Sequence, residues 1–302
     1  MDRHDPRPAA DVPERRGAHC LRAEPEAETV AKIVITGASG GIGAAAAIEL
    51  TRQGHDVLAT GRSASKLRSV RERMVGAAAP GQTVPDPIVA DLSSLAAVRV
   101  LAEDIAARWS SIDVLANNAA VSPTRRETSA DGYEMMLAVN HLAPFLLTHL
   151  LLEPLRAAGG RVVTTSSGAH RIGRIDFEDL QMERSFRPIR AYGRSKLANI
   201  WFTSELTSRT GLPASSYHPG AVNTDLGRSS RLAALAKPLM GVLTRTPEKG
   251  ADTLVWLATD PEGGAPRTIY YYDRKPGRMS ARGRDTARAV RLWDVSAELV
   301  DV

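Results

Sequence analysis

From Ala31 onward, short apolar runs rich in β-branched residues alternate with longer stretches in which apolar positions recur at helical spacing. The short runs predict strands, and the longer stretches predict helices. Strands are expected at residues 32–36, 56–60, 86–90, 113–116, 161–165, 214–218 and 268–272. Helices are expected to begin near Ile42, Ser65, Leu95, Gly132, Ala191 and Pro247. This alternation is typical of an α/β fold, in which helices cover both faces of a parallel sheet.

Two segments interrupt the alternation. Residues 168–188 are rich in charge and are expected to form an excursion on the surface. Residues 224–246 combine apolar side chains at helical spacing with basic ones, namely Leu232, Leu235, Leu239 and Val242 with Arg228, Arg231 and Lys237. Three interpretations of this second segment stay open: a mobile lid over a substrate, packing on the body of the domain, or shallow membrane contact.

No linker or internal repeat divides the series, so we expect one doubly wound domain of the Rossmann type over residues 31–302. Residues 1–30 are charged, rich in proline and arginine and poor in apolar side chains, which predicts a disordered tail. The single cysteine, Cys20, cannot form an internal disulfide and favours a reducing, cytoplasmic location. No run of roughly 18 apolar residues predicts a transmembrane helix.

The formal net charge of +5 does not by itself indicate a nucleic-acid partner. The cationic residues are dispersed among comparable numbers of acids and are not interleaved with stacking aromatic residues, so we expect no nucleic acid and at most peripheral membrane contact. The histidines show no metal-ligand spacing, and we expect no metal. A homo-oligomer is compatible with the sequence.

A glycine-rich stretch, Thr36-Gly37-Ala38-Ser39-Gly40-Gly41-Ile42-Gly43, joins the first predicted strand to an alanine-rich helix. Glycines let the backbone approach a pyrophosphate, and the amide groups at a helix N-terminus stabilise its negative charge. Glycine also serves ordinary tight turns, but this position between the first strand and the first helix favours a dinucleotide.

Tyr192 and Lys196 are four residues apart and therefore lie on one face of a predicted helix. The ammonium of Lys196 can sit near the phenol of Tyr192 and make it easier to ionise, so that a group with an ordinary pKa of about 10 works near neutrality. Together with the glycine-rich turn, this pair predicts hydride transfer to or from a carbonyl carbon, with Tyr192 moving the proton.

These motifs, in this order, resemble the short-chain dehydrogenase/reductase family from about Lys32 to the C-terminus. Further stretches match its retinol dehydrogenase-like branch: Ser166-Ser167-Gly168-Ala169-His170, Ser195-Lys196-Leu197-Ala198-Asn199 and Arg291-Leu292-Trp293. One departure is Ala120, which stands where the family usually has glycine and puts local packing in doubt.

The resemblance implies a catalytic set of Asn140, Ser167, Tyr192 and Lys196. It also implies a cofactor-binding set of Gly37, Ser39, Gly41, Ile42, Gly43, Arg62, Asp91, Leu92, Asn118, Tyr192, Lys196, Pro219, Gly220, Val222 and Thr224. Ser167 would hydrogen-bond the reacting oxygen, Lys196 would bind ribose hydroxyls, and Asn140 would position a water linking Lys196 to solvent. Taken singly, each also has an ordinary structural explanation.

The end of the second strand decides between the two nicotinamide cofactors. Thr60-Gly61-Arg62-Ser63 offers no carboxylate for the ribose hydroxyls, and Arg62 can pair with a 2′-phosphate. The alternative for Arg62 is a solvated loop residue. The sequence therefore favours NADP(H) over NAD(H).

The leading hypothesis is an NADP(H)-dependent oxidoreductase acting on a small apolar aldehyde or ketone or the corresponding alcohol, with Tyr192 as the general acid and base. Two alternatives stay open. One is a non-catalytic NADP(H)-binding sensor or scaffold, and the other is a biosynthetic ketoreductase dedicated to a large polycyclic substrate.

Overall fold

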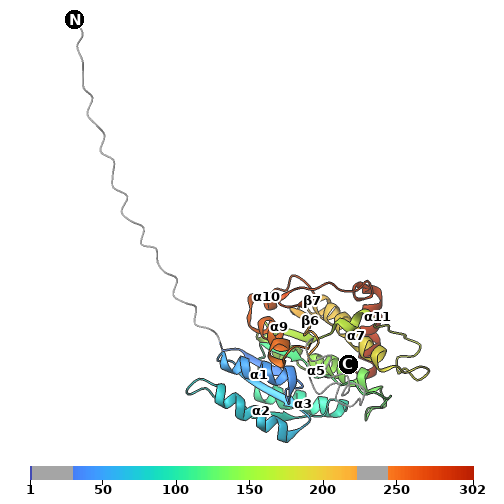
Figure 1. Ribbon diagram of the computed structural model, residues 1–302, viewed down its shortest axis with the longest axis horizontal. Coiled ribbons are helices and arrows are strands. Elements are labelled where there is room, and N and C mark those ends of the chain that lie inside the picture. Colours follow the sequence, from blue (N-terminus) through green and yellow to red (C-terminus); the bar gives the residue numbers. More distant parts are fainter. Residues whose placement is uncertain (2–29, 223–243) are drawn as a thin grey trace.

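The computed structural model describes residues 30–222 and 244–302, together with Met1. Its centre is an eight-stranded sheet in the order β3-β2-β1-β4-β5-β6-β7-β8 (Figure 1). β1 to β7 pair in parallel, and β8 pairs antiparallel with β7. The strands are β1 Lys32–Ile35, β2 Asp56–Gly61, β3 Ile88–Val89, β4 Val114–Asn117, β5 Arg161–Thr165, β6 Ala214–His218, β7 Tyr270–Tyr272 and β8 Lys275–Pro276.

Helices cover both faces of this sheet (Figure 1). One face carries α1 Gly41–Arg52, α2 Ala64–Ala77 and α9 Pro247–Thr259. The opposite face carries α3 Leu95–Arg108, α5 Ala143–Leu150, α7 Pro188–Thr210 and α11 Thr286–Val300. Shorter elements are α4 Met135–Leu137, the π-helical turn η1 Ala138–Leu142, α6 Leu152–Ala157, the 3-10 turn η2 Gly168–Arg171, α10 Pro261–Gly264 and the 3-10 turn η4 Arg282–Arg284.

Two apolar cores, one on each side of the sheet, explain why the strands read as nearly continuous apolar runs. Ile33 and Ile35 of β1 belong to the core under α1, whereas Val34 between them belongs to the core under α3 and α5. Successive side chains of a strand point to opposite faces, and both faces of a parallel sheet are covered. Trp201 and Phe202 are each only 2% exposed, which makes them core residues.

The doubly wound α/β fold is confirmed, with local corrections to its elements. The third and seventh strands are shorter than expected, because β3 begins at Ile88 and β7 at Tyr270. α7 begins earlier, at Pro188, a residue that suits the first turn of a helix because it lacks an amide hydrogen. β8 and α11 were not predicted, although α11 has a sequence signal in its Asp285 cap, which accepts from the Arg288 amide.

Several expectations lie outside the described residues. They are the disordered tail, the lid segment with its leucines, and the contribution of Thr224 to the cofactor site. Within the ranges that the structure describes, no helix has the length and apolarity needed to cross a membrane, and no cluster of three potential metal ligands occurs.

Candidate active site

The glycine-rich turn lies where β1 meets α1, beside the end of β4. Gly37 has φ +68, and a Cβ atom on it would lie 2.6 Å from the Cα of Ala119. A Cβ atom on Gly43 would lie 2.5 Å from both the Gly37 oxygen and the Asn118 side-chain nitrogen. Both positions therefore require glycine, because the turn packs directly against the backbone that follows β4.

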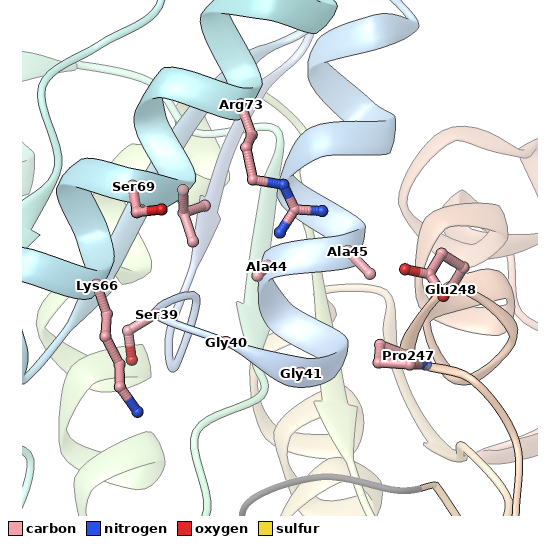
Figure 2. Close-up of a pocket in the computed structure, with 11 residues that line it drawn as sticks. Ser39, Gly40, Gly41, Ala44, Ala45, Lys66, Ser69, Arg73, Pro247 and Glu248 are labelled. Carbon is pink, nitrogen blue, oxygen red and sulfur yellow. The ribbon is translucent and has the colours of Figure 1, made fainter.

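A cavity of about 220 Å3 opens at the N-terminus of α1 (Figure 2). Gly40 begins this helix without a side-chain cap, so the first amides of α1 are left for an external acceptor. A Cβ atom built on Gly40 would meet nothing within 4 Å. Uncapped amides beside open space fit the phosphate groups of a dinucleotide.

Two cations on α2, Lys66 and Arg73, also line this cavity. Figure 2 shows Lys66 extending alongside Ser39. Arg73 comes from the same helix as Lys66, and Glu248 lies on the opposite side of the cavity. The sequence argument missed both cations, although their spacing of seven residues places them on one face of a helix. They add positive charge to a site expected to hold an anion.

Arg62 immediately follows β2, next to the glycine-rich turn. The Ser39 hydroxyl lies 3.2 Å from the position of a Cβ atom on Gly61, and the Ala38 amide donates to the Thr60 oxygen at 2.8 Å. The Arg62 side chain is exposed and makes no hydrogen bond or ion pair in the described part of the chain. Its guanidinium is therefore available to a ligand at this edge.

Asn118 links the ends of three strands. Its side-chain nitrogen donates to the Thr36 oxygen at 2.9 Å, and its side-chain oxygen accepts from the Thr165 hydroxyl at 3.4 Å. Its backbone amide donates to the Thr36 hydroxyl at 3.0 Å. These bonds join β1, β4 and β5 at their carboxyl ends, where the strand order reverses and ligands bind in this class of fold.

Ser167, Tyr192 and Lys196 come together at the same edge of the sheet. Tyr192 and Lys196 lie on α7, and Ser167 follows β5. Lys196 is 1% exposed, donates to the Thr165 oxygen at 3.0 Å and lies 5.6 Å from the centre of the Tyr192 ring. The structure thus brings three of the four expected catalytic side chains close together.

The ionisation of this pair differs from the expectation. Burial raises the pKa of Tyr192, and a hydrogen bond with the Ser167 side chain opposes that rise. Burial also lowers the pKa of Lys196 to about 7, because the charged ammonium loses its hydration. Burial thus favours the neutral forms of both groups, whereas the anticipated effect of Lys196 on the phenol requires a charged ammonium.

Asn140 lies in the π-helical turn η1 and is fully buried. Its side-chain oxygen accepts from the Val121 amide at 2.7 Å, and its nitrogen donates to the Val121 oxygen and to the Ser195 hydroxyl, each at 3.0 Å. The Ser195 hydroxyl in turn donates to the backbone carbonyl oxygen of Tyr192 at 2.9 Å. Asn140 is thus connected to the helix of Tyr192 and Lys196, and its expected water-positioning role stays a prediction.

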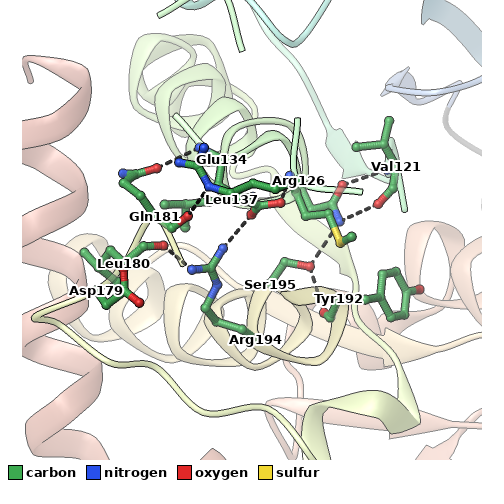
Figure 3. Close-up of polar contacts among 12 residues, drawn as sticks. Val121, Arg126, Glu134, Leu137, Asp179, Leu180, Gln181, Tyr192, Arg194 and Ser195 are labelled. Carbon is green, nitrogen blue, oxygen red and sulfur yellow. Dashed lines mark hydrogen bonds and ion pairs between the residues drawn. The ribbon is translucent and has the colours of Figure 1, made fainter. Parts of the chain in front are cut away.

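A buried ion pair supports the helix that carries Tyr192 and Lys196 (Figure 3). Arg194, two residues after Tyr192, pairs with Glu134 at 2.5 Å, and both side chains are at most 2% exposed. Glu134 also accepts from the amides of Met136 and Leu137 at 3.0 and 2.9 Å, which starts the helix that leads to Asn140. The sequence argument missed this pair, although Arg194 stands inside the Tyr192–Lys196 motif.

The remaining predicted cofactor residues surround the same edge. Asp91 is exposed, and its carboxylate accepts from the Ser93 amide at 3.0 Å, whereas Leu92 is buried. Pro219 and Gly220 follow β6, and Gly220 has φ +86. A Cβ atom on Gly250 of α9 would touch both Ile42 and Val222, so these two side chains lie together beside α1.

The profile of the short chain dehydrogenase family matches residues 31–234, more than half of the chain. The chain belongs to the short-chain dehydrogenase family. As a member, this short-chain dehydrogenase is an oxidoreductase that acts on alcohol or carbonyl groups with NAD(P). The sequence-based family assignment is thereby confirmed.

Two relatives and one solved structure extend the comparison. A protein of Streptomyces sp. (strain C5) named "Putative daunorubicin C-13 ketoreductase" is 42% identical over 270 residues, covering 89% of this chain and 92% of that one. Human retinol dehydrogenase 12 is 40% identical over 275 residues, covering 89% and 86%. A metagenomic short-chain oxidoreductase in complex with NADP is 25% identical with a TM-score of 0.59, covering 81% and 97%. The retinol dehydrogenase-like character of this short-chain dehydrogenase is confirmed.

Proposed function

We propose that the protein is an NADP(H)-dependent reductase or dehydrogenase of large apolar carbonyl compounds or their alcohols, with Tyr192 as the general acid and base. The observation that carries the proposal is the meeting of Ser167, Tyr192 and Lys196 at the sheet edge that also holds the glycine-rich turn. A sensor or scaffold would need the turn, but not this set of side chains.

Tyr192 moves the proton in this proposal. During reduction its hydroxyl donates to the oxygen of the former carbonyl, and during oxidation its phenolate accepts the proton of the alcohol. Ser167 hydrogen-bonds the same oxygen and holds it in line. The bound nicotinamide supplies or accepts the hydride. Lys196, whose ammonium donates to the backbone oxygen of Thr165, binds the ribose hydroxyls. When this ammonium is charged, it also favours the phenolate of Tyr192.

The charges at the adenosine end support NADP(H). The residues that end β2 and follow it, Gly61, Arg62 and Ser63, include no acid that could bind both ribose hydroxyls. Arg62 is free to pair with a 2′-phosphate through its planar fork, and Lys66 and Arg73 line the neighbouring cavity. Glu248, on the opposite wall of that cavity, belongs to α9 and not to the end of β2.

The size of the substrate is inferred from the relatives. One is named for retinol and the other for the ketone of daunorubicin, and both molecules have large ring-bearing apolar bodies. The name of the Streptomyces relative supports a second candidate function, in which the protein is a biosynthetic ketoreductase of a polycyclic ketone.

The test is steady-state reduction of retinal, a polycyclic aryl ketone and propanal, each with NADPH and with NADH. We expect NADPH to be the better cofactor and the two large compounds the better substrates. Tyr192→Phe keeps the ring but removes the transferable proton, so kcat should fall by about 100-fold or more. NADPH binding without turnover of any carbonyl would instead favour the sensor, and unchanged kcat in Tyr192→Phe would overturn the proton-transfer assignment.

A further inference from the structure

A second cavity, of about 550 Å3, lies at the carboxyl ends of β5, β6 and β7. Gly168, on its wall, immediately follows Ser167, so the cavity begins one residue from the proposed reaction centre. The other walls come from η2, from His218 at the end of β6, and from the β7–β8 hairpin. The cavity therefore adjoins the chain segment that carries Ser167.

Three cationic side chains line this cavity, Arg171, Lys275 and Arg278. All three are exposed, and neither Lys275 nor Arg278 has a side-chain hydrogen bond or ion pair within residues 30–222 and 244–302. One carboxylate, Asp273, also lines the wall, but it is already paired with Arg245, whose second nitrogen lies 2.8 Å from it. The free charge in the cavity is therefore positive.

The aromatic side chains of His218, Tyr270 and Tyr272 also line this cavity. His218 stacks on Tyr272 with ring centres 5.1 Å apart, and Tyr270, itself 2% exposed, packs against His170 at 5.0 Å. The Nδ1 atom of His218 accepts from the Gly220 amide at 3.2 Å, and burial lowers the pKa of His218 to about 4. The neutral ring therefore carries its proton on Nε2, 3.2 Å from the position of a Cβ atom on Gly168.

This arrangement combines flat apolar contact with positive charge. Aromatic faces bind rings, whereas an arginine fork and an ammonium bind carboxylate or phosphate oxygens. The Nε2–H of His218 adds a neutral donor between the reaction centre and the cations. An uncharged aliphatic substrate would leave all of these donors unused.

We propose that this cavity binds an anionic oxygen group, a carboxylate or a phosphate, carried on the ring-bearing body of the carbonyl substrate. Lys275 and Arg278 bind the anion, His218 and Tyr272 contact the adjoining ring, and the reacting carbonyl lies at Ser167. The proposal rests on the proposed function, because it assumes that the substrate reacts beside Ser167.

Binding is measured first, since it does not require turnover. The full-length protein is titrated calorimetrically with 2-naphthoate and with the neutral 2-naphthamide. We expect naphthoate to bind at least about 5-fold more tightly, and the preference to shrink in 0.5 M salt, because the cations are exposed and screened. Lys275→Ala/Arg278→Ala should abolish the preference, and Lys275→Glu/Arg278→Glu should reverse it. Arg68→Ala removes an exposed arginine from α2, away from this cavity, and should change nothing.

Kinetics then connect the cavity to the reaction. The matched substrates are 4-formylbenzoate and its methyl ester, each reduced with NADPH. We expect the acid to have a kcat/KM about 5- to 10-fold higher than that of the ester, because its KM is lower. The alanine double variant should bring this ratio to about 1 and retain kcat.

The outcomes separate the two proposals. Equal turnover of acid and ester, with no naphthoate preference, would leave the reductase standing and overturn the anion site. A naphthoate preference that is lost in the double variant, with neither aldehyde reduced, would support the anion site and count against the reductase. A naphthoate preference that survives both double variants would show that other residues bind the anion and would overturn the assignment.

Discussion

The two cavities described above are built in different ways. The cavity at the N-terminus of α1 has bare backbone on one side, at Gly40 and Gly41, and side chains of α2 and α9 on the others. The glycine-rich turn that supplies this backbone is fixed by crowding at Gly37 and Gly43. The cavity beside Ser167 is formed by side chains from three separate stretches, residues 168–171, 218 and 270–278. The glycine-rich side of the first cavity can be read from one continuous motif, whereas the walls of the second come together only after the chain has folded.

The difference separates what a family shares from what distinguishes its members. Backbone amides bind phosphate whatever the neighbouring side chains are, so the first cavity suits a common cofactor. Side chains on a rigid scaffold can change one at a time, so the second cavity suits a substrate particular to this protein. Three changes would break or sharpen this contrast.

The largest expected effect comes from the buried ion pair between Arg194 and Glu134. Glu134→Gln leaves the guanidinium of Arg194 buried without its ionic partner, which should lower the free energy of unfolding by about 3–5 kcal/mol. Chemical denaturation measures the loss. The matched control is Glu205→Gln, whose partner Arg209 is 37% exposed and also contacts Asp294, so about 1 kcal/mol or less is expected.

Comparable losses in the two glutamine variants would mean that the buried pair contributes no more than a surface pair. The helix carrying Tyr192 would then owe its position to apolar packing alone, and side-chain construction would matter less around Ser167 than we infer.

A smaller effect should separate two glycines of the same turn. Gly37→Ala forces an alanine into a left-handed conformation, at a cost of about 1–2 kcal/mol, and adds a clash with the Cα of Ala119. Gly40→Ala meets open space at φ 175, an extended conformation that any residue adopts. Thermal unfolding and NADPH titration should therefore show a loss of stability and affinity for Gly37→Ala, and retained stability for Gly40→Ala. If both variants behave alike, crowding at Gly37 does not fix the glycine-rich turn.

The smallest of the three effects concerns Arg62, which follows β2 beside the glycine-rich turn. Arg62→Ala should raise the KM for NADPH by about 10-fold, the scale of one charge-assisted contact, and leave the KM for NADH nearly unchanged. Arg73→Ala, on the cavity wall, is the informative comparison. A larger effect of Arg73→Ala than of Arg62→Ala would assign the 2′-phosphate to α2 instead of the end of β2.

Local chemistry explains which parts could be predicted. The strands, the glycine-rich turn and the Tyr192–Lys196 spacing depend on periodicity or backbone sterics, which a sequence shows directly. The pairing of Arg194 with Glu134 spans 60 positions, and Lys275 and Arg278 of the second cavity lie more than 100 positions beyond Gly168. Nothing local marks such partners. The sign of the Tyr192 shift was missed for the same reason, because burial is a property of the folded chain.

The side chain of Asn140 imitates a peptide group. A carboxamide offers one acceptor and one donor side by side, as a neighbouring strand does, and Asn140 presents both to the backbone of Val121. Asn140 thereby bonds the chain after β4 through the same donor and acceptor that a neighbouring strand would offer, although no strand lies at this position. An aspartate at this position would fit the same space but would set an acceptor against the Val121 oxygen. A single side-chain amide thus binds the segment after β4 to η1 in the way that a neighbouring strand would.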